Sequence, residues 1–283
     1  MNTKYTLIGF NLLLLSCIMH LFVGNAEAEE KLELWVHPYI PASQIIKGFS
    51  PLAEYLGEKI GQTIEVKVSK SYKSHYESVG EGRTDLAYLG PVSYVKITQN
   101  YGKQTLLASL EVNGSPHYYG MIVARQDSQI KTLADLIGKK FAFGDPNSTM
   151  GHIVPLYMLR EKGVPVEKLK SHEFLGSHHN VALSVLGGYY DAGAVKDEVY
   201  YEYKDRGLNM LAKSPPIAAH LFVANENLPQ ETVHAIRQLL INLKDTTILT
   251  SIEPSVTGMA EVKDEDYDNL RTILTQFDKF SPE

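Results

Sequence analysis

The stretch KFAFGDPNSTMG, residues 140–151, has the strand–loop–helix pattern that is typical of an α/β fold. A short apolar strand over 140–143 leads into a polar loop, and the spacing predicts a helix over about 148–162. The first amide N–H groups of a helix have no acceptor within it, and the helix dipole adds positive potential there. We therefore expect an anion at this junction, bound by the amides and by the hydroxyls of Ser148 and Thr149. The alternative is that these polar side chains only cap the helix.

The same order of strand and helix extends along the chain on both sides of this stretch. Strands are predicted near residues 32–36, 64–68, 85–89, 105–110, 118–125, 140–143, 173–175, 191–195, 209–212 and 220–224. Helices are predicted near residues 50–60, 92–100, 148–162, 178–186, from 229 onward and over 265–277, the first with Ser50 as cap and Pro51 in its first turn. Strands that alternate with helices favour an α/β fold whose sheets are covered on both faces.

Two such units predict two lobes, each a mixed, mostly parallel sheet flanked by helices. We expect residues 29–120 and 220–283 to form the first lobe and residues 121–219 the second, joined by hinge strands near 118–125 and 218–224. Ligands of open α/β sheets bind beyond the carboxyl ends of the strands. A binding site is therefore expected in a cleft between the lobes, in the loops that follow strands.

The first 28 residues have the order of a secretory signal peptide: Lys4, an apolar stretch over 5–24, and small residues before a cleavage point after Ala28. This predicts a protein of the periplasm. Two alternatives remain at this stage, a lipoprotein acylated at Cys17 and an uncleaved anchor. Because Cys17 is the only cysteine of the chain, no internal disulfide is possible.

The charge of the chain argues against nucleic acid as a partner. It has 27 Lys and Arg against 33 Asp and Glu and no basic run, whereas binding to a phosphate backbone requires a basic face. Sequence motifs of nucleophilic, phosphate-loop and zinc-dependent enzymes are missing as well, so the chain is predicted to bind without catalysing a reaction. Its histidines match no tight metal-binding spacing, and neither a metal nor a cofactor is expected.

Further candidate residues follow other predicted strands. His178 begins the helix after the strand at 173–175, where it can bond to an anion in a pH-dependent manner, and the alternative is a surface position. Glu198 follows the strand at 191–195, where it can accept a cationic group or simply favour the first turn of a helix. Leu89 and the aromatic Tyr72 lie in or near the post-strand segments of the first unit, where aromatic side chains can form a pocket wall.

Five short segments, in this order, resemble the phosphate, phosphite and phosphonate substrate-binding proteins that serve ABC importers. They are DLAYLGP at residues 85–91, GSP at 114–116, DPNSTMG at 145–151, GSH at 176–178 and KSP at 213–215. The resemblance extends from Leu32 to about Asn242. It implies a type II periplasmic binding protein fold that closes on a small anionic ligand and contacts the membrane only through its permease or a lipid anchor.

The resemblance also implies roles for single residues. Ser148, Thr149 and His178 would hold the oxyanion, Tyr72 would line the cleft, and an acidic residue at Glu198 would hold an amino group of the ligand.

Two positions depart from the family pattern. Met150 stands where many relatives have a second serine, and His220 stands in the ligand site where an aminophosphonate binder would have an acidic group. Both departures argue against an aminoalkylphosphonate as the ligand.

Three functions follow from this reasoning. The first is an exported solute-binding protein that delivers a phosphonate, phosphite or phosphate to an ABC permease. The second is a sensor of the same fold that docks on a signalling receptor. The third, least favoured, is a periplasmic hydrolase that uses His178 with Asp197 or Glu198.

Overall fold

Alternating apolar residues place β1 (Leu32–Val36) at the centre of three parallel strands, since Leu32, Leu34 and Val36 turn into the core. The computed structural model describes residues 31–278, with side chains up to 276. The predicted signal peptide, its cleavage point and Cys17 lie outside the described residues. β1 pairs in parallel with β2 (Ile64–Val68) and with β3 (Leu86–Leu89).

Three strands complete the first sheet: β4 (Thr105–Val112), β12 (Leu221–Ala224) and β13 (Val256–Ala260). The order of the strands is β13-β4-β12-β3-β1-β2. β12 is antiparallel to both of its neighbours, and β13 is antiparallel to β4. The other four strands therefore run in one direction, as expected for a mixed, mostly parallel sheet.

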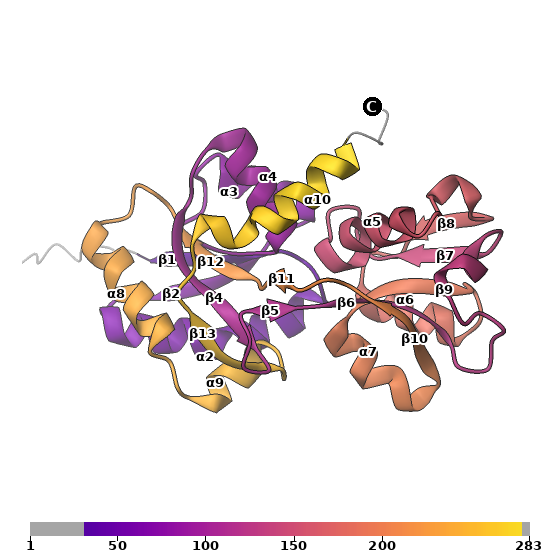
Figure 1. Cartoon of the computed structure of the whole chain (residues 1–283). Coiled ribbons are helices and arrows are strands. Elements are labelled where there is room, and N and C mark those ends of the chain that lie inside the picture. Colours follow the sequence, from indigo (N-terminus) through magenta and orange to yellow (C-terminus); the bar gives the residue numbers. More distant parts are fainter. Residues whose placement is uncertain (1–30, 279–283) are drawn as a thin grey trace, which may run out of the picture. The chain divides into compact units, whose positions relative to one another are not determined.

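Helices cover both faces of this sheet (Figure 1). On one side lie α2 (Ala42–Ile60), α8 (Gln230–Ile241) and α9 (Thr246–Ile252), and on the other lie α3 (Tyr72–Gly80), α4 (Pro91–Tyr101) and α10 (Asp268–Asp278). No helix among residues 31–278 combines the length and the apolar character needed to cross a membrane.

The start of the first helix differs from the prediction. Ser50 and Pro51 were expected at its beginning, but α2 starts at Ala42 and Pro51 lies inside it. Proline removes one helical hydrogen bond. The apolar face nevertheless continues across it, with Ile45 and Phe49 fully buried. Burying two such side chains stabilises the fold by about 3–6 kcal/mol, which offsets the lost bond.

The second sheet has the strand order β10-β6-β9-β7-β8. Its strands are β6 (Gly120–Arg125), β7 (Lys140–Phe143), β8 (Ser171–Phe174), β9 (Ala192–Lys196) and β10 (Leu208–Lys213). Only β6 runs against the others among these five strands. α5 (Val154–Glu161) covers one face, and α6 (His178–Leu186) and α7 (Asp197–Tyr203) cover the other (Figure 1).

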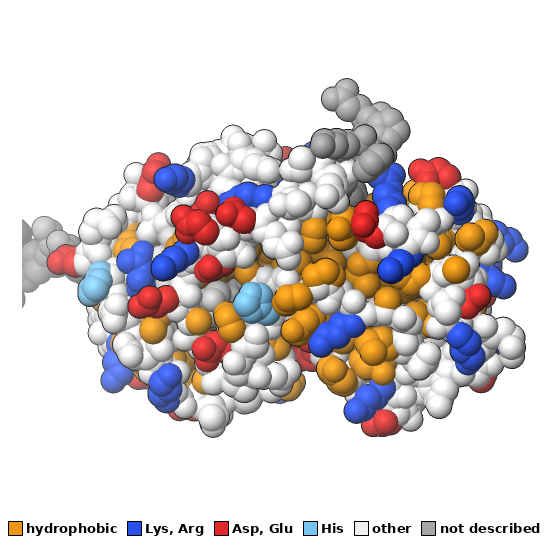
Figure 2. Space-filling view, viewed as in Figure 1, with side chains coloured by type: hydrophobic (Ala, Val, Ile, Leu, Met, Phe, Trp, Pro, Cys, Tyr) orange, Lys and Arg blue, Asp and Glu red, His pale blue; other side chains and the backbone are white. Residues whose placement is uncertain are grey.

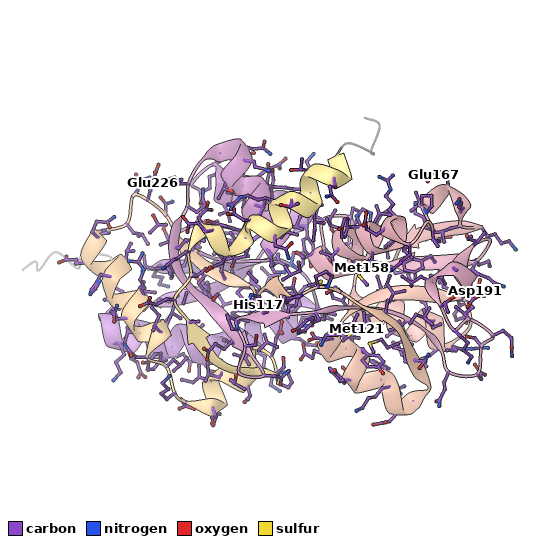
Figure 3. The ribbon with its side chains drawn as sticks, in the orientation of Figure 1. His117, Met121, Met158, Glu167, Asp191 and Glu226 are labelled. Atoms are coloured by element: carbon purple, nitrogen blue, oxygen red, sulfur yellow. The ribbon has the colours of Figure 1, made fainter. Side chains whose placement is uncertain are left out.

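The side chains of β6 alternate between two apolar cores. Met121 and Val123 pack with residues of α6 and α7, whereas Ile122 and Ala124 belong to the larger core that includes α5. Figure 3 shows Met121 and Met158 on opposite sides of this strand. Both faces of the sheet are therefore buried, which explains why the strand reads as a continuous apolar run.

The chain passes between the sheets at two places. The predicted strand over 118–125 divides into β5 (His117–Tyr118) and β6, and β5 pairs with β11 (Ile217–Ala218). We call the part built on the six-stranded sheet the first lobe and the part built on the five-stranded sheet the second lobe. The predicted lobe boundaries themselves stay a prediction. Figure 2 shows acidic and basic side chains interspersed over the face in view, in agreement with the weak net charge.

Candidate functional site

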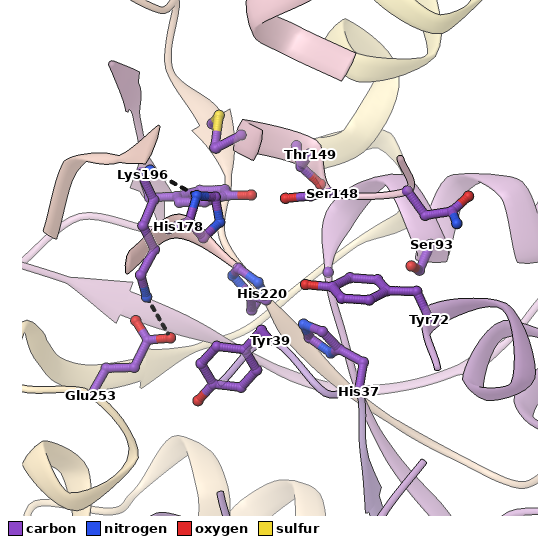
Figure 4. A pocket seen from close by; sticks show the side chains of 14 residues that line it. His37, Tyr39, Tyr72, Ser93, Ser148, Thr149, His178, Lys196, His220 and Glu253 are labelled. Atoms are coloured by element: carbon purple, nitrogen blue, oxygen red, sulfur yellow. Dashed lines mark hydrogen bonds and ion pairs between the residues drawn. The ribbon is translucent and has the colours of Figure 1, made fainter. Parts of the chain in front are cut away.

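A small cavity lies between the carboxyl ends of the two sheets (Figure 4). Both lobes contribute to its wall, through loops that follow β1, β3, β7 and β9. The lining residues are His37, Tyr39, Tyr72, Gly90, Ser93, Tyr118, Asn147, Ser148, Thr149, Met150, His178, Lys196, His220 and Glu253. This is the position at which open α/β sheets bind ligands.

The helix after β7 begins at the cavity. Ser148 is its N-cap, and the Ser148 Oγ accepts the N–H of Gly151 at 3.0 Å. Thr149 and Met150 occupy the first two helical positions, where an amide has no acceptor within the helix. The amide donors available to an anion at this end of the helix are therefore those of Thr149 and Met150.

The amides of Asn147 and Ser148, just before the helix, already donate within the loop and are not free to bind an anion. The N–H of Asn147 donates to the Asp145 carboxylate at 2.7 Å, and the N–H of Ser148 donates to the Asp145 carbonyl at 2.9 Å. Asp145 thus closes the loop in front of the helix. Burial raises the pKa of Asp145, an effect that the bonds from Asn147 oppose.

Proline and glycine shape the first turn of this helix. Pro155 has no N–H to donate to the Gly151 carbonyl, which instead accepts the N–H of Gly144 at 2.8 Å. The backbones approach so closely that a Cβ on Gly144 would lie 3.1 Å from the Gly151 Cα. The turn over Thr149–Ile153 is accordingly widened to a π-helix before α5 begins.

The Thr149 hydroxyl links the two lobes. Its Oγ1 accepts the N–H of Val92, in the first turn of α4, at 3.0 Å, and it also bonds to the Tyr118 hydroxyl. Gly90 and Ser93, at the start of α4, line the same cavity. Two helix N-termini, one from each lobe, therefore converge on this point, and both favour an anion.

His178 is the first residue of α6, whose N-cap is Ser177. Its Nδ1 lies 3.2 Å from the backbone N–H of Lys196. A backbone N–H can only donate, so Nδ1 accepts in this bond, and the ring also bonds to the backbone carbonyl of Ala194, which can only accept. Burial lowers the pKa of His178 to about 3, so the ring is neutral at neutral pH.

Aromatic rings of the first lobe form the opposite wall. Tyr72 begins α3, and its ring centroid lies 4.9 Å from that of His37. His37 and His220 are stacked at 5.7 Å with an interplanar angle of 6°. Burial lowers the pKa of both histidines, that of His220 to about 3. This wall is therefore uncharged at neutral pH.

One ion cluster crosses the cleft beside the cavity. The Nζ of Lys196, at the end of β9, lies 2.9 Å from Glu253 Oε1 in the first lobe and 2.5 Å from Glu198 Oε2 in the second. Burial alone would lower the pKa of Lys196, but the two carboxylates outweigh it and raise the pKa. Lys196 is thus charged and paired, and it holds the lobes together at this edge.

Two tyrosines separate the cavity from wider spaces. Tyr39 and Tyr72 also border an open groove at the mouth of the cleft, and Tyr39 borders a further pocket that includes Glu198.

Within residues 31–278, no three His, Cys, Asp or Glu side chains are grouped so that they could hold a metal ion.

Comparison with known proteins identifies the family. The family model described as "ABC transporter, phosphonate, periplasmic substrate-binding protein" matches residues 34–267. The chain belongs to this family. The phosphate-import protein PhnD of Mycolicibacterium smegmatis is 30% identical over 275 residues, which cover 86% of this chain and 85% of that protein. The phosphonates-binding periplasmic protein of Escherichia coli is 25% identical, over 70% of this chain and 62% of that protein.

Solved structures agree on the fold. PhnD1 of Prochlorococcus marinus in complex with methylphosphonate matches with a TM-score of 0.81 and 19% sequence identity, over 89% of this chain and all of that one. A binding protein of an ABC phosphonate transporter from Pseudomonas aeruginosa matches with a TM-score of 0.76 and 20% identity, over 87% of this chain and 86% of that one. The predicted two-lobed fold is confirmed, and the chain is a substrate-binding protein of ABC transport and not an enzyme.

The structure brings together most of the side chains that we predicted for the site. Ser148, Thr149, His178, Tyr72 and His220 all line the cavity. Whether they contact a ligand stays a prediction.

Two predicted residues lie elsewhere. Leu89, at the end of the buried strand β3, points into the core, and its neighbour Gly90 reaches the cavity instead. Glu198 lies in the adjacent pocket, where it pairs with Lys196. This ion pair occupies the carboxylate that we expected to hold an amino group of the ligand.

Sequence reasoning missed part of this substrate-binding site. The missed residues are His37, Tyr39, Ser93, Lys196 and Glu253. His37 directly follows a predicted strand, so the rule that led to His178 would have found it as well. No local pattern marks Glu253, which reaches the cavity from the loop after α9.

Buried neutral histidines make this binding protein sensitive to acid. His75 is 1% exposed, donates from Nε2 to the Tyr88 carbonyl, and has its pKa lowered to about 4 by burial. The unfolded chain takes up a proton on His75 below about pH 6.5, whereas the folded chain does so only near pH 4. The free energy of unfolding therefore has its full value above about pH 6.5. It falls by about 1.4 kcal/mol per pH unit between about pH 6.5 and pH 4.

Urea unfolding between pH 7 and pH 5 measures this effect. The His75→Phe variant has no imidazole to protonate. It should reduce the pH dependence of the unfolding free energy by about 1.4 kcal/mol per pH unit below about pH 6.5. An equal pH dependence in the variant and in the natural chain would show that His75 does not contribute.

Proposed function

We propose that this chain captures a small phosphorus oxyanion, of the phosphate, phosphite or phosphonate class, and delivers it to an ABC importer. One observation carries the proposal. The free amides of Thr149 and Met150 and the Ser148 hydroxyl lie at one cavity, which His178 also lines. Oriented donors of this kind at a helix N-terminus stabilise an anion.

The relatives support the ligand class. Those named above are described as a phosphate-import protein and as a phosphonates-binding protein, and the similar solved structure holds methylphosphonate. All three ligands present phosphorus-bound oxygens, which the same donors can bind. The paired state of Glu198 argues against a ligand with an amino group.

Closure of the lobes would trap the ligand. The contacts that join the lobes next to the cavity include the bond between Val92 and Thr149 and the ion pair between Lys196 and Glu253. Both would break when the hinge strands open, which would expose the anion to the permease. We further propose that residues 1–28 direct export to the periplasm and are cleaved after Ala28, which the mass of the exported protein would check.

A thermal-shift screen of the purified protein tests this function. Phosphate, phosphite, methylphosphonate, 2-aminoethylphosphonate and sulfate are added separately. At least one of the first three should raise the melting temperature, since a ligand at a hundredfold excess over its Kd stabilises the native state by about 2.7 kcal/mol. A screen in which none of the phosphorus anions changes the melting temperature would refute the proposed ligand class.

A further inference from the structure

The cavity offers an anion no unpaired positive charge among the residues that line it. Lys196 is the only lysine or arginine in this set, and two carboxylates already pair with it. The lining histidines are neutral at neutral pH. Recognition must therefore depend on the direction of hydrogen bonds, and the position of each proton on the imidazole rings becomes decisive.

The proton of His37 is placed by its partner. Its Nδ1 lies 3.3 Å from the Tyr88 carbonyl oxygen, and a carbonyl can only accept. The ring therefore carries its proton on Nδ1, and Nε2 is left with a lone pair. Figure 4 shows the His37 ring pointing toward the Tyr72 hydroxyl and His220, on the cavity side. His37 is 2% exposed and lines the cavity.

His178 bonds to the backbone on a different strand. Its Nδ1 accepts the backbone N–H of Lys196, and the ring also bonds to the backbone carbonyl of Ala194. Of these two neutral imidazoles, His37 is the one that leaves an acceptor without a backbone partner. The acceptor is unusual in a site for an anion, because an oxygen without a proton gives it nothing to bind.

We propose that the cavity selects an oxyanion that still carries a proton, with His37 Nε2 accepting from the ligand's hydroxyl. The inference rests on the proposed function and specifies the protonation state of its ligand. Phosphorus oxyanions fulfil this condition near neutral pH, since their last proton leaves in that range, at a pKa of about 6 for phosphate esters. Sulfate has no such proton and would leave the lone pair of His37 facing a negative oxygen.

Other groups around the two imidazoles also bear on any pH dependence. The neighbours of His37 and His178 that carry charge or can titrate are His75, His179, His220, Lys196, Glu198, Glu253, Tyr39, Tyr72 and Tyr88. Burial holds the pKa of His75 at about 4 and that of His220 at about 3, and it raises the pKa of the three tyrosines. These rings keep their protonation state between pH 7 and pH 8.5, while the protonated fraction of the ligand falls with rising pH.

Calorimetry on the natural protein tests the inference without any variant. Methylphosphonate and sulfate are titrated into the protein at pH 7 and at pH 8.5. The affinity for methylphosphonate should fall about tenfold per pH unit above the second pKa of the ligand, in proportion to the protonated fraction. Sulfate should bind at least about tenfold more weakly than methylphosphonate at pH 7.

A matched pair of variants assigns the effect to His37. His37→Phe should lower the affinity for methylphosphonate at pH 7 about tenfold and remove its pH dependence, while leaving sulfate binding unchanged or stronger. His75→Phe removes another buried imidazole that bonds to the same Tyr88 carbonyl but does not line the cavity. It should keep the affinity and the pH dependence of the natural chain.

The outcomes separate the two proposals. Equal affinity for sulfate and methylphosphonate, or an affinity that is unchanged from pH 7 to pH 8.5, would overturn the selection for a protonated anion alone. A His37→Phe variant that keeps the full pH dependence would do the same. If no oxyanion binds at either pH, the proposed function fails and this inference fails with it.

Discussion

Replacing Ser148 and Thr149 together by alanine should lower the affinity for the oxyanion about a hundredfold or more. The change removes the Ser148 hydroxyl, which caps the helix and lines the cavity. It also removes the Thr149 hydroxyl, which accepts the N–H of Val92 across the cleft at 3.0 Å. A hydrogen bond from Ser148 to the charged ligand contributes about 1.5–3 kcal/mol and the neutral bond between Val92 and Thr149 about 0.5–1.5 kcal/mol, so the two losses together account for this decrease.

Calorimetry with the best ligand of the thermal-shift screen measures the loss. Thr132→Ala serves as the matched control, because Thr132 caps the turn Leu133–Leu136 in the same lobe and does not line the cavity. The control should lose some stability and keep its affinity. If the double variant remains folded and binds as the natural chain does, the helix N-terminus at Thr149 is not the anion site.

Replacing Lys196 by methionine should lower the free energy of unfolding by about 3–5 kcal/mol. The lysine side chain is 9% exposed and pairs with two carboxylates of which Glu253 is also 9% exposed. Methionine fills a similar volume but leaves both carboxylates without a counter-charge. Removing one partner of a buried ion pair costs more than the pair itself contributes, because the remaining charge stays out of water.

Lys67 offers a matched control for this change. It also contacts two carboxylates, those of Glu33 and Glu65, but its side chain is 32% exposed. Urea unfolding should therefore show a clearly smaller loss for Lys67→Met than for Lys196→Met. Adding Glu253→Gln to Lys196→Met should recover part of the loss, because the remaining charge is removed. Equal losses for the two lysines would show that Lys196 is not a buried ion-pair partner.

Local sequence patterns were sufficient for most of the elements around the site. The strand at 140–143 and the helix at 178–186 have the predicted bounds. These features depend on neighbours within a few positions, through the alternation of apolar side chains and through caps. The prediction failed at Ser50 and Pro51, where the burial of Ile45 and Phe49 carries the helix past a proline.

The site shows the same division between local and distant causes. The loop that places Ser148 and Thr149 could be found from the sequence, because a strand followed by a capped helix always presents its first amides at that edge. Glu253 could not be found, because its role depends on Lys196, 57 positions earlier in the sequence, ending a strand of the other lobe at 2.9 Å.

Periodicity and capping, which act over a few residues, were enough to predict the alternation of strands and helices and the helix N-terminus that offers amides to an anion. Five short motifs were enough to indicate the family. The charge of the cavity and the bonding of its imidazole rings could be seen only in the folded chain. Burial, and partners such as the Tyr88 carbonyl for His37, determine those properties, and they arise when segments distant in the chain pack together.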